Sequence, residues 1–145
     1  MNGRNWTWVD FKSTINDVSW KEADVKIGSL HTIAELTYHI HYFTQVALRV
    51  LEGGPLEGDD AVSFNHAPIT SGTDWQNFLS NIFRESERFS QLINLLNDSA
   101  LIEPFADRKY GNYYRNLAGI IEHHHYHLGQ IVMLKKLIRE QKLVT

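Results

Sequence analysis

Cysteine is absent from the 145-residue sequence, which excludes disulfide bonds, thiolate nucleophiles and cysteine-based zinc or iron–sulfur sites. No apolar run approaches the ~20 residues that a membrane-spanning helix needs, and residues 1–10 lack the apolar segment of a signal peptide. Blocks of basic residues are also missing, and the net charge is −3, so non-specific binding to nucleic acid is not expected. We therefore expect a cytoplasmic protein with neither a nucleic-acid nor a membrane partner.

The length fits one domain spanning residues 1–145. Hydrophobic residues make up 43% of the chain and include four Trp, seven Phe and six Tyr, enough bulky material for a core without disulfides. Hydrophobic spacing predicts four helices and no strand. Four amphipathic helices can bury their apolar faces only against one another, so the expected fold is an all-α four-helix bundle.

The first predicted helix is short, over about residues 4–18, and residues 19–29 are expected to form a connection. The second helix begins at Thr32, because Thr32 and Glu35 have the spacing of a capping box. A Gly-Gly-Pro sequence at residues 53–55 is expected to end it.

The third helix is predicted to start at Thr73, with a second capping box from Thr73 to Gln76, and to end near residues 97–98. The fourth runs from about residue 113 to residue 141, with Asn112 as its N-cap. The loop between the second and third helices, residues 54–72, could span roughly 60 Å when extended. It is long enough to cross the bundle and make these two helices parallel, which the spacing alone does not decide.

Histidine is abundant, with eight residues in the chain. On a helical wheel His39 lies on the buried face of the second helix, and His123 and His127 lie one turn apart beside the apolar face of the fourth. A pair at i, i+4 and a third histidine from a neighbouring helix can hold one divalent ion and leave positions open for water or substrate. The spacing thus predicts a metal site at these three residues. For each histidine alone, the ordinary interpretation is a core side chain bonded to a carbonyl or hydroxyl.

His124 also falls within the buried arc and forms a feasible i, i+3 pair with His127, so the wheel leaves the choice between His123 and His124 open. The other histidines are expected outside the site, at the surface or in the long loop: His31, His41, His125 and His66. Gln130 can face the core and hold an imidazole by a hydrogen bond. Glu35 is interpreted as a helix cap rather than as a partner of His39.

Three tyrosines near the predicted site are interpreted as an aromatic seam rather than as proton donors: Tyr38, Tyr42 and Tyr126. No acidic residue clearly points into the site, since Glu122 lies about 100° around the helix from His123. Gly129 costs about 1 kcal/mol relative to Ala inside a helix, which is tolerable if another helix or a partner subunit approaches its backbone.

Residues 121–131, IEHHHYHLGQI, resemble the last-helix signature of the DinB-like (damage-inducible, YfiT-like) superfamily, in which H-x-x-x-H is followed by x-G-Q-I. Residues 32–40, TIAELTYHI, resemble the second-helix signature, which carries a third ligand at His39. The resemblance covers the second to fourth helices and favours His123 over His124. It implies an up-down-down-up bundle, a homodimer, and one divalent ion per chain, zinc or nickel.

The resemblance also implies a metal-dependent thiol S-transferase acting on a small-molecule substrate with a low-molecular-weight thiol. Because the chain has no cysteine, the thiol has to come from the substrate. Two alternatives stay open: a metal-dependent hydrolase, weakened by the lack of a carboxylate base, and a non-enzymatic metal-binding or stress-response dimer. A third interpretation leaves the histidines without metal, as packing residues. The sequence does not identify catalytic residues or decide whether the protein is an enzyme.

Overall fold

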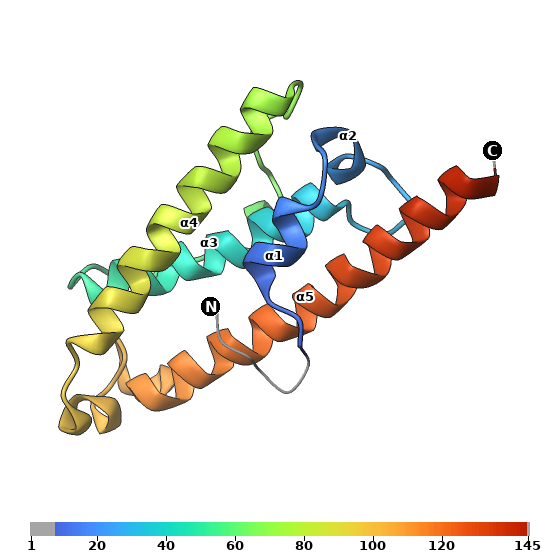
Figure 1. Ribbon diagram of the computed structural model, residues 1–145. Helices are drawn as coiled ribbons and strands as arrows, with labels where there is room; N and C mark the ends of the chain where they lie inside the picture. Colours follow the sequence, from blue (N-terminus) through green and yellow to red (C-terminus); the bar gives the residue numbers. More distant parts are fainter. Residues whose placement is uncertain (1–7, 145) are drawn as a thin grey trace.

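The computed structural model of the chain describes residues 8–144, with side chains described as far as residue 141. Three long helices dominate this part of the chain: α3 (Ile33–Leu51), α4 (Gly72–Asn94) and α5 (Tyr113–Val144) (Figure 1). Two short helices, α1 (Phe11–Asn16) and α2 (Trp20–Ala23), precede them. The loops contain three short 3₁₀ turns, η1 (Asp60–Val62), η2 (Asp98–Ile102) and η3 (Arg108–Tyr110). No strand forms within residues 8–144, and the predicted all-α bundle is confirmed.

The predicted caps of α3 and α5 are confirmed. The Oγ1 of Thr32 accepts a hydrogen bond from the Glu35 backbone N–H at 3.1 Å, and the Glu35 carboxylate accepts one from the Thr32 N–H at 2.8 Å. Asn112 caps α5, since its Oδ1 accepts a hydrogen bond from the Arg115 N–H at 2.9 Å. After α3 ends, Gly53 turns the chain with φ of +85°, a conformation that favours glycine.

The predicted start of α4 is wrong. Its N-cap is Ser71 instead of Thr73, because the Ser71 Oγ accepts a hydrogen bond from the Asp74 N–H at 3.1 Å. The Asp74 carboxylate reaches back to Thr70, whose N–H and hydroxyl donate to it at 3.0 and 2.8 Å. Ser71 and Asp74 have the same spacing as Thr73 and Gln76, and the carboxylate is the stronger acceptor. The helix also ends earlier than predicted, at Asn94.

The first helix is shorter than the predicted residues 4–18. Residues 8–10 are not helical, because Asp10 is extended and caps α1, with its Oδ1 accepting from the Ser13 N–H at 2.8 Å. Residues 4–7 lie outside the described part of the chain. The predicted connection over residues 19–29 contains the one-turn helix α2, which a capping box from Ser19 to Glu22 stabilises.

Helices α3 and α4 are parallel. Contacts between the two helices advance in the same direction along both. Tyr38 contacts Phe78, Gln45 contacts Glu85, and Glu52 at the end of α3 contacts Arg88. Both helices lead toward the end of the bundle at which α5 begins (Figure 1). The long loop therefore crosses the length of the bundle, as its reach allowed.

Helix α5 runs antiparallel to α3 and parallel to α1. Thr14 accepts a hydrogen bond from Lys135 at 3.1 Å, and Asp17, one turn later, pairs with Arg139 at 2.9 Å. The order of directions along the chain is up-down-down-up, which confirms the topology implied by the resemblance. The core lies between these helices and is filled by aliphatic residues around Trp75, whose indole N–H donates to the Val18 carbonyl at 2.8 Å.

Candidate metal centre

Three imidazoles from two helices meet inside the bundle. His39 comes from α3, and His123 and His127 come from successive turns of α5. One ring nitrogen of each lies within 4.8 Å of those of the other two. The Nε2 atoms of His39 and His123 are 3.0 Å apart, and the three ring centroids are separated by 4.5 to 4.9 Å. The structure thus brings together the three residues that the sequence predicted as a ligand set.

A serine from the long loop orients the first imidazole. The Nδ1 of His39 lies 2.8 Å from the Oγ of Ser63, which is completely buried. Ser63 donates its own hydroxyl proton to the Asp60 carbonyl at 2.8 Å, so its oxygen accepts from Nδ1–H of His39. This tautomer leaves the lone pair of His39 on Nε2, the atom that faces the other two histidines.

A glutamine orients the second imidazole in the same way. The Oε1 of Gln130 lies 2.7 Å from the Nδ1 of His127. An amide oxygen only accepts, so Nδ1 carries the proton and Nε2 keeps its lone pair. This contact is the one predicted for Gln130 from its position in α5. Ligating histidines are commonly held by such a hydrogen bond from the other ring nitrogen.

The third imidazole is held by packing and by its contact with His39. The buried Nδ1 of His123 has no hydrogen-bond partner among the residues that the structure describes. Its ring lies edge-on to Phe43, with centroids 5.2 Å apart. Its Nε2 faces the lone pair on the Nε2 of His39, an arrangement that a shared proton or a cation between the two atoms stabilises.

Burial keeps all three imidazoles neutral. It lowers the pKa of His39 from 6.5 to about 4, and the neighbouring His127 and His123 lower it further. Burial is also the main cause that lowers the pKa of His123 and that of His127. Neutral imidazole is the form that coordinates metal.

The spacing of the ring nitrogens also suits a metal ion. Nitrogens bound to one zinc ion at 2.0–2.1 Å are ~3.3 Å apart in tetrahedral geometry. The Nε2 atoms of His39 and His123 are 3.0 Å apart, and the ligand nitrogens of all three histidines lie within 4.8 Å of one another, so small side-chain shifts would fit them to a divalent ion.

The sequence did not reveal the acidic residue beside this centre. We expected none, but the carboxylate of Asp60 lies close enough for its charge to raise the pKa of His39 and that of His123, against the larger effect of burial. Its Oδ1 is 3.3 Å from the Ser63 Oγ. Both residues belong to the loop between α3 and α4, where no periodicity predicts which way a side chain points.

An aromatic side chain of the same loop covers the centre. Phe64 stacks on the ring of His39 at 4.0 Å and on that of His31 at 3.9 Å, with planes within 8° of parallel. His31 is about half exposed, as expected, and bonds to Glu35 at 3.0 Å. Glu35 pairs with His31 and Lys26 and acts as the predicted cap of α3. Phe64 therefore shields one face of the His39 imidazole from water.

The remaining histidines are placed elsewhere. His124 is buried, but its Nε2 lies 3.0 Å from the Oγ1 of Thr44 and it takes no part in the three-histidine group. His125 is exposed, as predicted, and its Nδ1 bonds to the Ile121 carbonyl at 2.8 Å. His66 packs near the rings of Tyr38 and Phe78, outside the centre, as expected.

The prediction that His41 lies at the surface is wrong. Only 3% of its surface is exposed, because α4 packs over it. Its Nε2 is 3.3 Å from the carboxylate of Glu85, yet burial has the larger effect and lowers the pKa of His41.

The three tyrosines fit the interpretation as an aromatic seam in part. Tyr38 and Tyr42 pack together, with ring centroids 6.3 Å apart. Tyr126 is 65% exposed, and its ring centroid lies 4.8 Å from that of His127.

The fold and the centre define a class: up-down-down-up helical bundles with a three-histidine group able to hold a metal ion. A family model described as the DinB superfamily matches residues 5–131, and the chain belongs to this superfamily. Comparisons with curated proteins and with solved structures find no significant match. Within residues 8–144, none of the helices combines the length and the apolar character needed to cross a membrane.

Proposed function

We propose that His39, His123 and His127 bind one divalent ion per chain, zinc or nickel, and that the protein is a metal-dependent thiol S-transferase. The observation that carries the proposal is the fixed direction of the lone pairs. Ser63 and Gln130 accept protons from the Nδ1 atoms of two imidazoles. Each Nε2 therefore keeps its lone pair as a possible ligand, and one ring nitrogen of each of the three histidines lies within 4.8 Å of those of the other two.

In such a centre the ion and the residues of the chain have separate roles. A divalent ion bound there supplies a Lewis acid that lowers the pKa of a thiol or of water. Phe64 excludes water on the side of His39. Asp60 places a negative charge near His39 and His123, where its carboxylate can accept a proton released from a substrate. The chain provides no thiol of its own, so the nucleophilic sulfur belongs to a low-molecular-weight thiol substrate.

Asp60 also favours a second candidate, a metal-dependent hydrolase. Activation of water commonly uses a carboxylate as general base, and the sequence alone offered none. Asp60 supplies one, at 3.3 Å from the Ser63 hydroxyl that holds His39. Transfer to a thiol remains the leading proposal, because the two helix signatures resemble those of thiol transferases and isomerases of the superfamily. A non-enzymatic, metal-binding stress protein is the alternative if no reaction is found.

We further propose that the protein is a homodimer and that it works in the cytoplasm, where low-molecular-weight thiols stay reduced. Three of the exposed apolar side chains of α5 lie along one side of the helix: Tyr126 is exposed by 65%, Met133 by 56% and Leu137 by 37%. Gly129 faces open space on the same helix, since no atom of another described element lies within 4 Å of the place a Cβ would take. A second copy of the chain could approach the helix backbone closely at that position.

Elemental analysis of protein purified without a tag tests the first step. We expect about one zinc or nickel ion per chain, loss of the ion in His39→Ala and in His123→Ala, and retention in the matched control His125→Ala, which alters an exposed histidine of the same helix. Full retention of metal by the first two variants would show that the site is wrong.

The second step is a reaction assay on the metal-loaded protein with a small thiol and an electrophile. Product above the uncatalysed rate supports the transferase, with loss of that product in His123→Ala. Metal without any product, with the same thiol or with an ester in place of the electrophile, supports the non-enzymatic alternative. Ester hydrolysis without thiol consumption supports the hydrolase.

A further inference from the structure

The outward face of α5 is centred on a glycine that no described part of the chain requires. Gly129 lies near the middle of this helix, which runs along one side of the molecule (Figure 1). It points about 180° away from the buried Ile138 on the helical wheel. Its φ is not positive, and a Cβ at this position would meet no atom of another described element within 4 Å. Because glycine inside a helix costs stability relative to alanine, its small size suits a neighbour outside the chain that approaches the backbone.

Apolar side chains are exposed on both sides of this glycine. Ile121 is exposed by 51%, Tyr126 by 65%, Met133 by 56% and Leu137 by 37%. All four lie within about two turns of Gly129 along α5, and none is more than about 80° from it around the helix. Apolar surface gathered in this way on one face of a helix marks an interaction site.

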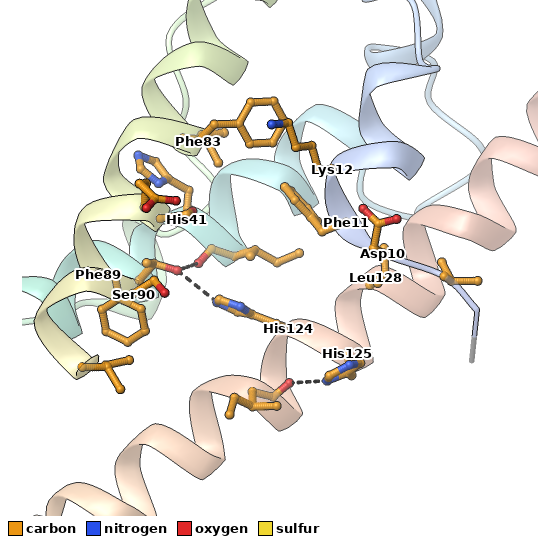
Figure 2. A pocket seen from close by; sticks show the side chains of 18 residues that line it. Asp10, Phe11, Lys12, His41, Phe83, Phe89, Ser90, His124, His125 and Leu128 are labelled. Carbon is orange, nitrogen blue, oxygen red and sulfur yellow. Dashed lines mark hydrogen bonds between the residues drawn. The ribbon is translucent and has the colours of Figure 1, made fainter. Parts of the chain in front are cut away.

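His125 belongs to the same outward face, in contrast to its neighbour His124. Figure 2 shows His124 turned toward α3, where its Nε2 lies 3.0 Å from the Oγ1 of Thr44. His125 is turned the other way, with its Nδ1 2.8 Å from the Ile121 carbonyl. A carbonyl oxygen only accepts, so Nδ1 carries the proton and the Nε2 of His125 faces outward with a free lone pair.

The charges along this face are complementary to those of a second copy. Glu122 lies seven residues before Gly129 and Lys136 lies seven residues after it, each about 20° from the direction of Gly129. Both are exposed, and neither forms an ion pair within the described part of the chain. If a second α5 crosses the first at Gly129 in the antiparallel direction, Glu122 faces Lys136 of the partner subunit. Two-fold symmetry repeats this ion pair on the other side of the crossing point.

The antiparallel arrangement also brings apolar residues together. Residues equally far from Gly129 become neighbours across the interface: Tyr126 and Val132, Ile121 and Leu137, and His125 and Met133. A parallel arrangement would instead place each residue opposite its own copy. Glu122 would then face Glu122 and Lys136 would face Lys136, and like charges at such positions repel. The face is therefore complementary to itself in one direction only.

We propose that two copies of the chain pair through this face, with their α5 helices nearly antiparallel and in contact at Gly129. The inference rests on the homodimer proposed above and assigns its interface. The absence of a side chain at Gly129 lets the helices approach closely, and the pairs of Glu122 with Lys136 fix their direction. Tyr126 connects the interface to the candidate metal centre, because its ring centroid lies 4.8 Å from that of His127.

Engineered cysteines test the direction of the two helices, because the chain has no cysteine of its own. Glu122→Cys combined with Lys136→Cys places two thiols about 21 Å apart on one helix, too far for a disulfide within a chain. We expect oxidation of this double variant to give a covalent dimer, whereas each single variant stays uncrosslinked. Crosslinking of Glu122→Cys alone, or no crosslinking of the double variant, would overturn the arrangement.

Charge reversal followed by sedimentation equilibrium tests the ion pairs. Glu122→Lys acts twice in each dimer and should raise the dissociation constant of the dimer at least about tenfold. Adding Lys136→Glu to this variant should restore the dissociation constant to within about threefold of the original, since it recreates the pairs with their charges exchanged. Glu87→Lys, at an exposed position of α4, is the matched control and should leave the dissociation constant unchanged.

A bulky side chain at the crossing point gives a third readout. Gly129→Leu should abolish the dimer while the chain stays folded and keeps its metal, because the new side chain points into open space in the single chain. A dimer that neither Gly129→Leu nor Glu122→Lys weakens would overturn this interface but leave the proposed homodimer standing. A chain that is monomeric at all concentrations would overturn both, and metal analysis of the same samples tests the centre separately.

Discussion

The Nδ1 of His39 and the Oγ of Ser63 lie 2.8 Å apart although 24 residues separate them in the chain. Ser63 is completely buried, and its hydroxyl donates a hydrogen bond to the Asp60 carbonyl, so its oxygen accepts the hydrogen bond from the imidazole. The loop that carries Ser63 crosses the bundle and thereby sets the tautomer of a residue on α3.

Ser63→Ala should weaken metal binding without abolishing it. The substitution removes the acceptor that holds Nδ1–H of His39, and loss of such a partner typically costs 10–100-fold in metal affinity. Competition of the protein with a chromophoric chelator measures the change. Ser80→Ala, at an exposed position of α4, serves as the control. Unchanged affinity in Ser63→Ala would show that the loop does not orient the ligand.

Metal occupancy should fall with pH over a range set by the buried imidazoles. Protons compete with the ion for the histidine lone pairs. Burial, followed by the charges of His127 and His123, lowers the pKa of His39 from 6.5 to about 4. Because a bound ion competes with the proton, we expect full occupancy at pH 6.5 and loss only as the pH falls to about 4 and below. Elemental analysis after dialysis at each pH would measure the occupancy, and an occupancy that does not depend on pH would argue against histidine ligation.

Acid should weaken the attachment of α1 to α5. Hydrogen bonds from Arg139, then from Lys135, lower the pKa of Asp17 from 3.8 to about 2. A carboxyl group whose pKa is lower in the folded chain stabilises the fold above its unfolded pKa. That stability is lost as the pH falls from about 4 toward 2.

Denaturant titrations between pH 5 and pH 2 measure this dependence. Asp17→Asn should be less stable than the unaltered chain at pH 5 and should show a smaller loss on acidification. Because the Asp17 side chain is 63% exposed, added salt should reduce the difference. A difference that persists unchanged at pH 2 would show that the charge of Asp17 is not its cause.

Trp75→Ala should be among the most destabilising substitutions in the chain. Trp75 is 1% exposed and donates its indole N–H to the Val18 carbonyl. Truncation of a buried Trp costs about 3–5 kcal/mol, which chemical denaturation would measure. Leu95→Ala, at a residue that is 78% exposed, should change the free energy of unfolding by less than about 0.5 kcal/mol. Similar losses in both variants would contradict the assigned core.

Position on a helical wheel explains why the structure brings together the three histidines that the sequence predicted, although the wheel did not separate His123 from His124. His39, His123 and His127 share directions with the apolar stripes of their helices, and helical geometry carries such directions over several turns. The same reasoning failed for His41, because the wheel records only the largest apolar stripe of α3. A second helix, α4, packs on another side of α3 and buries His41 against Glu85.

Helix ends were predicted where one set of capping residues had no competitor. Thr32 and Glu35 form the only such pair at the start of α3, and the structure confirms it. At the start of α4, Ser71 and Thr73 both precede a suitable partner by three residues. The hydrogen bonds of Asp74 to Thr70 decide in favour of Ser71, and these contacts involve the loop as well as the helix.

The sequence by itself determined the helices and the bundle, because these depend on periodic patterns within single helices. It also determined the three histidines, although the choice of His123 over His124 came from the resemblance of the helix signatures and not from periodicity. Tertiary structure alone decided the contributions of Ser63, Asp60 and Phe64 and the burial of His41. These features depend on where a long loop crosses the bundle and on which helix covers which face. No local pattern contains that information, since side chains distant in sequence meet only when the chain has packed.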